Sequence, residues 1–124
     1  MLFGKTEQSL EAATHYSGLR HKVIANNIAN VDTPGYKAVD ISFGEQLGDV
    51  IRARENGFGA SSLREPTLSF IPDINSRRPS IDGNTVNIDQ QLTMLSQNAI
   101  YHNACVQLLN SKFRILKTAL SPGG

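Results

Sequence analysis

The sequence has little of what holds many small proteins together. Its 124 residues include one cysteine, no tryptophan and only 6 % aromatic residues. A single cysteine excludes an intrachain disulfide, and so few aromatic side chains leave little bulk for a core. Ten asparagines and eleven serines stand where apolar residues are more usual. We therefore expect a chain of one domain's length that covers apolar surface by assembly more readily than in its own interior.

Charge and long apolar runs are also scarce. Charged residues make up 19 %, and 12 Lys+Arg against 11 Asp+Glu leave a net charge of +1. This balance argues against a nucleic-acid-binding domain, which usually carries a basic face. No run approaches the roughly 18 apolar residues of a membrane helix. Residues 1–10 lack the apolar core of a cleaved signal peptide, so any export is expected to use a route without one.

The first segment, residues 5–31, contains no proline and is predicted to form an amphipathic helix. Its apolar residues recur mostly every three to five positions: Leu10, Ala13, Tyr16, Leu19, Val23 and Ile28. At ~1.5 Å per residue the helix would be about 40 Å long. Pro34 and Gly35 then predict a stop followed by a type II turn, with the glycine at the position that needs a positive φ.

The middle segment, residues 32–88, is rich in turn-forming residues. Ser42 and Glu45 have the spacing of a capping box and predict a short helix from 43 to about 54. Residues 67–71 are a candidate for a short strand. The glycines, serines and prolines between them predict a long irregular loop, and a loop of this length indicates binding or disorder.

The last segment, residues 89–120, carries the strongest signal in the sequence. Apolar residues advance by alternating steps of three and four, which predicts one helix with a coiled-coil seam. The seam positions are Leu92, Leu95, Ala99, His102, Val106, Leu109, Phe113, Leu116 and Leu120. Asp89 is expected to cap the helix or lie in its first turn, and Ser121 and Pro122 to end it. The predicted fold is therefore mainly α: a single domain, 1–124, whose two long terminal helices pair as an antiparallel coiled-coil-like hairpin around a loop-rich middle.

Two polar strings stand out. The first, ANNIANVDTPGYK at residues 25–37, crowds three asparagines at the end of a predicted helix. Their amides are suited either to neighbouring backbone groups before the turn or to contacts with another chain. The second, DGNTVNID at 82–89, offers oxygen donors for calcium. Counted as an EF-hand loop, however, it places Val86 and Thr93 where ligands are required, so a turn into the last helix is favoured.

These strings carry a family resemblance. The first resembles the N-terminal signature of bacterial flagellar rod, hook and related axial proteins. The second, followed by a heptad helix that contains QNAIY at 97–101, resembles the smallest subunits of that family, those of the proximal rod. The resemblance spans nearly the whole chain. It departs at Gln91 and Leu92, where the family usually has Glu-Met; leucine keeps the seam apolar, but glutamine removes a charge. The motif residues expected to serve assembly are Asn26, Asn27, Asn30, Thr33, Pro34, Gly35, Tyr36, Asp82, Gly83 and Asn84.

The resemblance implies a structural subunit of the flagellar basal-body rod. Such a subunit polymerises through its terminal helices, encloses the export channel and transmits torque for motility. The implied partners are copies of itself, other rod proteins, the adapter between rod and membrane ring, the MS ring and the export gate. The implied location is the periplasm-spanning rod, reached by flagellar type III export without a cleaved signal peptide. No cofactor, metal, nucleic acid or small-molecule substrate is implied.

Two other classes of function were weighed. A small cytosolic regulator or adaptor would dimerise through the last helix and bind a partner through the loop. An enzyme would need a catalytic constellation, and the nearest candidate is Cys105 with His102, three residues apart on one helix. No third group that would orient this pair is evident, so no catalytic residue is predicted.

Overall fold

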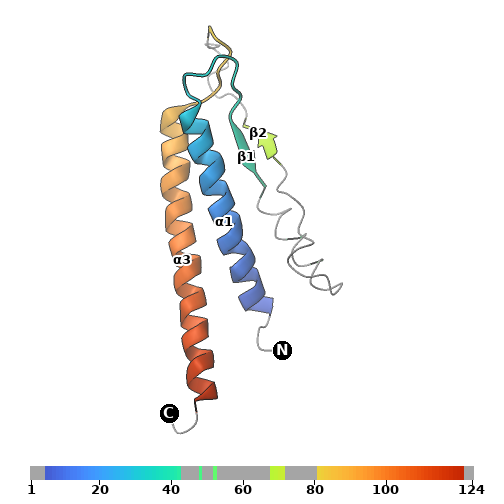
Figure 1. Ribbon diagram of the computed structural model, residues 1–124, viewed down its shortest axis with the longest axis vertical. Helices are drawn as coiled ribbons and strands as arrows, with labels where there is room; N and C mark the ends of the chain where they lie inside the picture. The colour runs from blue at the N-terminus through green and yellow to red at the C-terminus, as the bar shows by residue number, and fades with distance from the viewer. Residues whose placement is uncertain (1–4, 43–47, 49–51, 53–67, 72–80, 122–124) are drawn as a thin grey trace.

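The computed structural model describes residues 5–42, 48, 52, 68–71 and 81–121. Its elements are two long helices and two short strands, in the order α1 (Lys5–Ala29), β1 (Val39–Ile41), β2 (Leu68–Phe70) and α3 (Ile88–Leu120). Figure 1 shows α1 and α3 side by side, with the strands on the other side of α1 and both chain ends at the same end of the molecule. The predicted antiparallel hairpin of terminal helices is confirmed.

Helix α1 ends two residues before the predicted limit at residue 31. Asn30 closes it in two ways. Its backbone N–H donates to the carbonyl oxygen of Asn26 at 3.1 Å, and its side-chain Nδ2 donates to the same oxygen at 2.8 Å. Asparagine is well suited to this position because its short amide can satisfy carbonyls that lose their helical partners.

Helix α3 has complete polar caps at both ends. Asn87 is the N-cap, and its Oδ1 accepts a hydrogen bond from the backbone N–H of Gln90 at 3.1 Å. Asp89 lies in the first turn and Lys117 in the last, where their charges complement the helix dipole. The backbone N–H of Ser121 closes the C-terminus on Lys117 and Thr118. These signals explain why the sequence located both ends of α3 within one residue.

The interior between the helices and β1 is small and nearly half polar. The buried apolar residues are Ala12, Ala13, Tyr16, Ile24, Ala38, Ile41 and Cys105, and the buried polar ones are Ser17, Asn27, Asn84, Gln91 and Asn98. Small side chains on α1 let α3 approach closely, but they bury little apolar area. Packing among the described residues therefore supplies modest stabilisation, since stability scales with the apolar area buried.

The two strands form a minimal antiparallel sheet beside α1. Val39 pairs with Phe70, Asp40 with Ser69, and Ile41 with Leu68. The predicted strand at 67–71 is confirmed as β2, whereas its partner β1 was not predicted. The short helix predicted from 43 to 54 falls on residues outside the described ranges, apart from positions 48 and 52.

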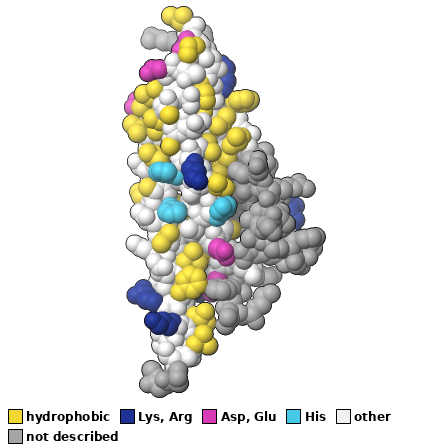
Figure 2. Space-filling model, in the orientation of Figure 1, with side chains coloured by type: hydrophobic (Ala, Val, Ile, Leu, Met, Phe, Trp, Pro, Cys, Tyr) yellow, Lys and Arg dark blue, Asp and Glu magenta, His cyan; other side chains and the backbone are white. Residues whose placement is uncertain are grey.

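Large apolar side chains lie on the surface of the same structure. Figure 2 shows them spread over the visible face of the molecule. On α3 the exposed ones are Ile88, Leu92, Ile100, Tyr101, Leu108, Phe113, Ile115 and Leu120. An exposed set of this size on one helix marks a surface for association rather than a solvent face.

Candidate assembly site

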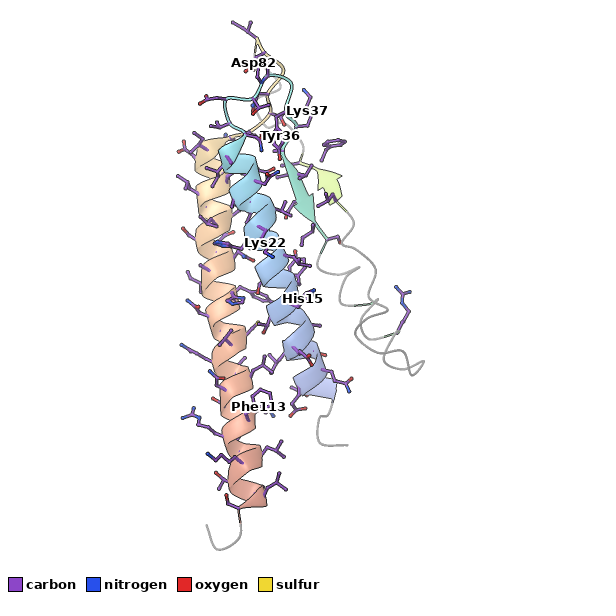
Figure 3. All side chains as sticks on the ribbon, viewed as in Figure 1. His15, Lys22, Tyr36, Lys37, Asp82 and Phe113 are labelled. Atoms are coloured by element: carbon purple, nitrogen blue, oxygen red, sulfur yellow. The ribbon has the colours of Figure 1, made fainter. Side chains whose placement is uncertain are left out.

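The two polar strings meet at the end of the hairpin where α1 finishes and α3 begins. We call this cluster the apical network; it comprises Asn26, Asn27, Asn30, Thr33, Gly35, Tyr36, Lys37, Asp82, Gly83, Asn84, Thr85 and Gln91. Figure 3 shows Tyr36, Lys37 and Asp82 together beyond the ends of the two helices. Of the ten predicted motif residues, nine belong to this network, and Pro34 lies within its turn.

Asn27 is the buried centre of the apical network. Its side chain has no exposed surface and makes four hydrogen bonds. Nδ2 donates to the carbonyl of Val39 at 2.7 Å and to Oε1 of Gln91 at 3.0 Å. Oδ1 accepts from the hydroxyl of Tyr36 at 3.0 Å and from the backbone N–H of Val39 at 3.2 Å. The side-chain amide of Asn27 thus links α1 to β1, to α3 and to the turn by hydrogen bonds, and all its donor and acceptor positions are used.

Asn84 performs the equivalent task from the second string. Its Nδ2 donates to the carbonyls of Asn30 and Thr33 at 2.9 and 2.8 Å, and its Oδ1 accepts from the backbone N–H of Val86 at 2.8 Å. Asp82 Oδ1 in turn accepts from the backbone N–H of Asn84 at 3.1 Å. These oxygens and amides are therefore committed to backbone groups. Among the residues that the structure describes, no group of three His, Cys, Asp or Glu side chains could hold a metal ion.

Backbone contacts hold the two strings together directly. The N–H of Gly35 donates to the carbonyl of Asp82 at 2.8 Å, and the N–H of Thr85 donates to the carbonyl of Tyr36 at 3.0 Å. Lys37 Nζ donates to the carbonyl of Gly83. The ends of the intervening segment are thereby fixed to each other.

Gly35 occupies the turn position that the sequence predicted. Its φ is +74°, and the N–H of Tyr36 donates to the carbonyl of Thr33 at 3.2 Å, as in a type II turn. A Cβ added to Gly35 would meet no atom within 4 Å, so any penalty for a side chain here comes from the backbone rather than from a clash.

Gly35→Val is expected to reduce rod incorporation while leaving expression intact. A β-branched residue at this φ is strained by roughly 1–3 kcal/mol, which would displace Tyr36 from Asn27. Gly35→Asn is the matched control, because asparagine tolerates a positive φ better than most residues. Swimming on soft agar and immunoblots of whole cells measure the two effects. Equal swimming of the valine and asparagine strains would contradict the turn assignment.

Gln91 was noted from the sequence only as a departure from the family pattern. The structure buries it completely, with Oε1 accepting from Asn27 Nδ2. A neutral amide suits this position, since an unpaired charge here would be costly to bury. Thr85 also was not predicted as a site residue, although its Oγ1 accepts from the backbone N–H of Ala38 at 2.9 Å. Hydrophobic patterning carries no signal for either contact.

The predicted seam on α3 is only partly covered within the chain. Leu95, His102, Val106, Leu109 and Leu116 are half-buried, whereas Leu92, Ala99, Phe113 and Leu120 are exposed. The residues of α3 that are fully buried are Gln91, Asn98 and Cys105. The expectation that α1 covers the apolar repeat therefore differs from the structure, because α3 turns a neighbouring, more polar stripe toward α1.

Polar contacts also attach β1 to the middle of α1. The Arg20 guanidinium donates two hydrogen bonds of 3.0 Å to the Asp40 carboxylate, and this hydrogen bonding to Asp40 raises the pKa of Arg20 above its ordinary value. The hydroxyl of Tyr16 donates to the carbonyl of Ile41 at 3.0 Å, and burial raises the pKa of Tyr16. With both pKa values raised, Arg20 stays charged and Tyr16 stays neutral near neutral pH. These contacts therefore position β1 and do not act as a pH switch in that range.

Cys105 and His102, the pair considered for nucleophilic chemistry, have different neighbours in the structure. Cys105 is buried against α1, while His102 Nδ1 lies 2.5 Å from Ser17 Oγ. Tyr101 neighbours the thiol, and its pKa is raised mainly by burial and further by Cys105. In the described ranges, moreover, no helix is long and apolar enough to cross a membrane.

Comparisons with known proteins agree on one family. A family model described as flagella basal body rod protein matches residues 19–37, the end of α1 and the first string. The whole chain is 36 % identical over 126 aligned positions to the flagellar basal body rod protein FlgB of Bacillus subtilis (strain 168), with 98 % of both chains covered.

More distant relatives carry the same description. The chain is 31 % identical over 129 positions to the flagellar basal body rod protein FlgB of Salmonella typhimurium, with 91 % of each chain covered. It is 30 % identical over 129 positions to that of Escherichia coli (strain K12), again with 91 % of each covered.

Proposed function

The chain belongs to the FlgB family of flagellar basal body rod proteins, and from this membership we propose that it polymerises through its terminal helices to build the proximal rod. It is a structural subunit of the basal-body rod, in a family of structural proteins rather than enzymes. In the proposal, the assembled helices enclose the export channel, and the rod transmits the torque needed for motility.

The observation that carries the proposal is the uncovered apolar repeat on α3. Leu92 and Phe113 are each 47 % exposed and Leu120 is 64 % exposed, although their heptad spacing is typical of buried seams. Helix α1 already occupies the adjacent stripe. A helix of a neighbouring subunit that packed on these exposed side chains would add apolar burial to that within the chain.

The proposed partners follow from the same family. They are copies of this chain, other rod proteins, the adapter between the rod and the membrane ring, the MS ring and the export gate. The proposed route is flagellar type III export, with the rod crossing the periplasm. A small interior with many polar groups supports such a route, because a hairpin of modest stability unfolds at low cost. A cytosolic dimeric regulator is not favoured, since the relatives are rod proteins.

Leu92→Gln tests the proposal at the uncovered repeat. We expect the wild-type chain to co-purify with detergent-extracted basal bodies, and the variant to be recovered there in much lower amount. The helicity of the isolated variant should match wild type, because Leu92 does not support the hairpin. Thr93→Gln is the matched control, since Thr93 is exposed on the next position of the same helix.

Quantitative immunoblots of basal-body and soluble fractions measure the result. Recovery of wild-type chain only in the soluble fraction, as a dimer, would favour the regulator and refute the rod assignment. Equal recovery of the Leu92 and Thr93 variants would refute only the role of the apolar repeat in assembly, and would leave the rod assignment standing.

A further inference from the structure

The interface between α1 and α3 is polar at positions that are apolar in ordinary coiled coils. The three buried residues of α3, Gln91, Asn98 and Cys105, are spaced seven apart and form one stripe. On α1 the facing residues Ser17 and Asn27 have no exposed surface. The apolar repeat begins one position later, at Leu92. Helix α3 thus carries two adjacent stripes, and the less apolar one faces its own partner helix.

Asn98 makes the central contact of this interface. Its Nδ2 donates to the main-chain carbonyl of Ser17 at 2.8 Å. The Ser17 hydroxyl donates to the carbonyl of Thr14 at 2.8 Å and lies 2.5 Å from His102 Nδ1. Because the hydroxyl has one proton, we assign Nδ1 as the donor to Ser17 Oγ. Two residues on successive turns of α3, Asn98 and His102, therefore both contact Ser17 of α1.

This contact fixes the axial position of the helices. A slip of a single residue moves a helix by about 1.5 Å along its axis. Such a slip would lengthen and misalign the hydrogen bond between the Asn98 amide and the Ser17 carbonyl, and so weaken it. A leucine at position 98 would have no comparable dependence on register, because apolar contacts are not directional.

The contact is not optimal for stability. The Asn98 side chain is 2 % exposed, and among the described residues its Oδ1 has no hydrogen-bond partner. A buried acceptor without a donor lowers the free energy of unfolding. Replacing buried polar groups by apolar groups of similar volume is often neutral or stabilising. The free energy of unfolding is therefore expected to be lower with asparagine at position 98 than it would be with leucine.

We propose that Asn98, together with Ser17 and His102, sets the register and rotation of α3 on α1 and so keeps the apolar repeat facing outward. A rotation of about 100°, one residue around the helix, would instead turn Leu92 and Ala99 onto α1. That arrangement would bury more apolar surface in the isolated chain and remove it from neighbouring subunits. A single polar residue in a helical seam selects one arrangement in this way. The consequence for assembly rests on the proposed function, whereas the effect on the hairpin does not.

Three variants test the proposal in the full chain. Asn98→Leu removes the polar contact and keeps the volume. Asn98→Asp keeps the shape but replaces the donor with an acceptor facing the Ser17 carbonyl. Asn103→Leu makes the same polar-to-apolar change at an exposed position of α3 and is the control. The measurements are the urea midpoint by far-UV circular dichroism, the rate at which a thiol reagent labels Cys105, and recovery in basal bodies.

The expected signature of Asn98→Leu combines an unchanged or raised urea midpoint with faster labelling of Cys105. Cys105 is the only thiol and lies on the same stripe, so it becomes accessible when α3 samples other rotations. If about one chain in ten kept the native rotation, recovery in basal bodies would fall about tenfold, since only competent chains assemble. Asn98→Asp should lower both the midpoint and recovery, and Asn103→Leu should change neither.

A lower midpoint for Asn98→Leu would overturn the proposal, because the amide would then be an ordinary stabilising contact. A raised midpoint with slower Cys105 labelling would also overturn it, since the native rotation would then survive without the amide. Failure of the proposed function would give a different result, because the wild-type chain would then be absent from basal bodies. The urea midpoint and the rate of Cys105 labelling would still decide the role of Asn98 in the hairpin.

Discussion

Asn27→Asp is expected to abolish swimming and to destabilise the helical hairpin. The change replaces the Nδ2 donor with a carboxylate oxygen that faces two acceptors, the carbonyl of Val39 at 2.7 Å and Gln91 Oε1 at 3.0 Å. Asn27 has no exposed surface, so water cannot solvate the charge. A lost donor at a buried site and an unpaired charge together cost about 3 kcal/mol or more. Urea unfolding followed by circular dichroism, together with soft-agar swimming, measures the effect.

Asn26→Asp is the matched control, because it makes the same change one residue earlier. Asn26 is exposed; its Nδ2 donates to the hydroxyl of Tyr36 at 3.1 Å, and its Oδ1 accepts from Asn30 Nδ2 at 3.4 Å. We expect a change below about 1 kcal/mol, as for most surface substitutions. Burial would raise the pKa of the new carboxyl at position 27, so acid should restore part of the stability by protonating it. Equal losses at positions 26 and 27 would contradict the central place of Asn27 in the apical network.

Leu109→Asp is expected to stop rod assembly and to weaken the hairpin in isolation. Leu109 is half-buried and lies between Cys105 and Lys112 on one face of α3. Lys112 Nζ lies 3.8 Å from a carboxylate oxygen of Glu7, so this face meets the start of α1. Removing the leucine should cost about 2 kcal/mol, the lower end for buried leucines. Basal-body fractionation and urea unfolding measure the two losses.

Two controls separate packing from charge at this position. Leu108→Asp introduces the same carboxylate on the neighbouring, exposed position and should leave the urea midpoint nearly unchanged. Lys112→Gln removes one partner of an ion pair whose lysine is 43 % exposed, and such pairs contribute about 0–1 kcal/mol. A mild Leu109→Asp phenotype, or a larger loss from Lys112→Gln, would mean that this face of α3 is not the one packed on α1.

The helices and the turn were predictable because their signals are local. Periodic apolar residues, the asparagines at the end of α1 and the glycine after Pro34 each act within a few positions. The structure places the ends of α3 within one residue of the prediction, and Gly35 has the positive φ that the turn requires. The resemblance to axial proteins also rested on contiguous strings, and comparison of the whole chain with its relatives confirms it.

The face of α3 that packs on α1 was not predictable from the apolar pattern. A heptad repeat indicates that a stripe is buried somewhere, but it does not distinguish burial within the chain from burial between chains. In this protein the repeat that includes Leu92 and Phe113 remains exposed, while Gln91 and Asn98 face α1. The contacts of Ser17, Thr85 and Gln91 escaped prediction for a related reason. Hydrogen bonds between distant residues leave no periodic trace in the sequence.

The contacts between the two polar strings hold together the two points at which the chain leaves the helical hairpin and returns to it. Tyr36 and Thr85 are joined by a backbone hydrogen bond of 3.0 Å, and Thr85 Oγ1 accepts from Ala38. The chain therefore departs from the hairpin and returns to it at the same place. Lengthening such a closed excursion costs only about 0.6 kcal/mol for each doubling of its length. An insertion between β2 and the second string is accordingly expected to leave the register of α1 and α3 unchanged.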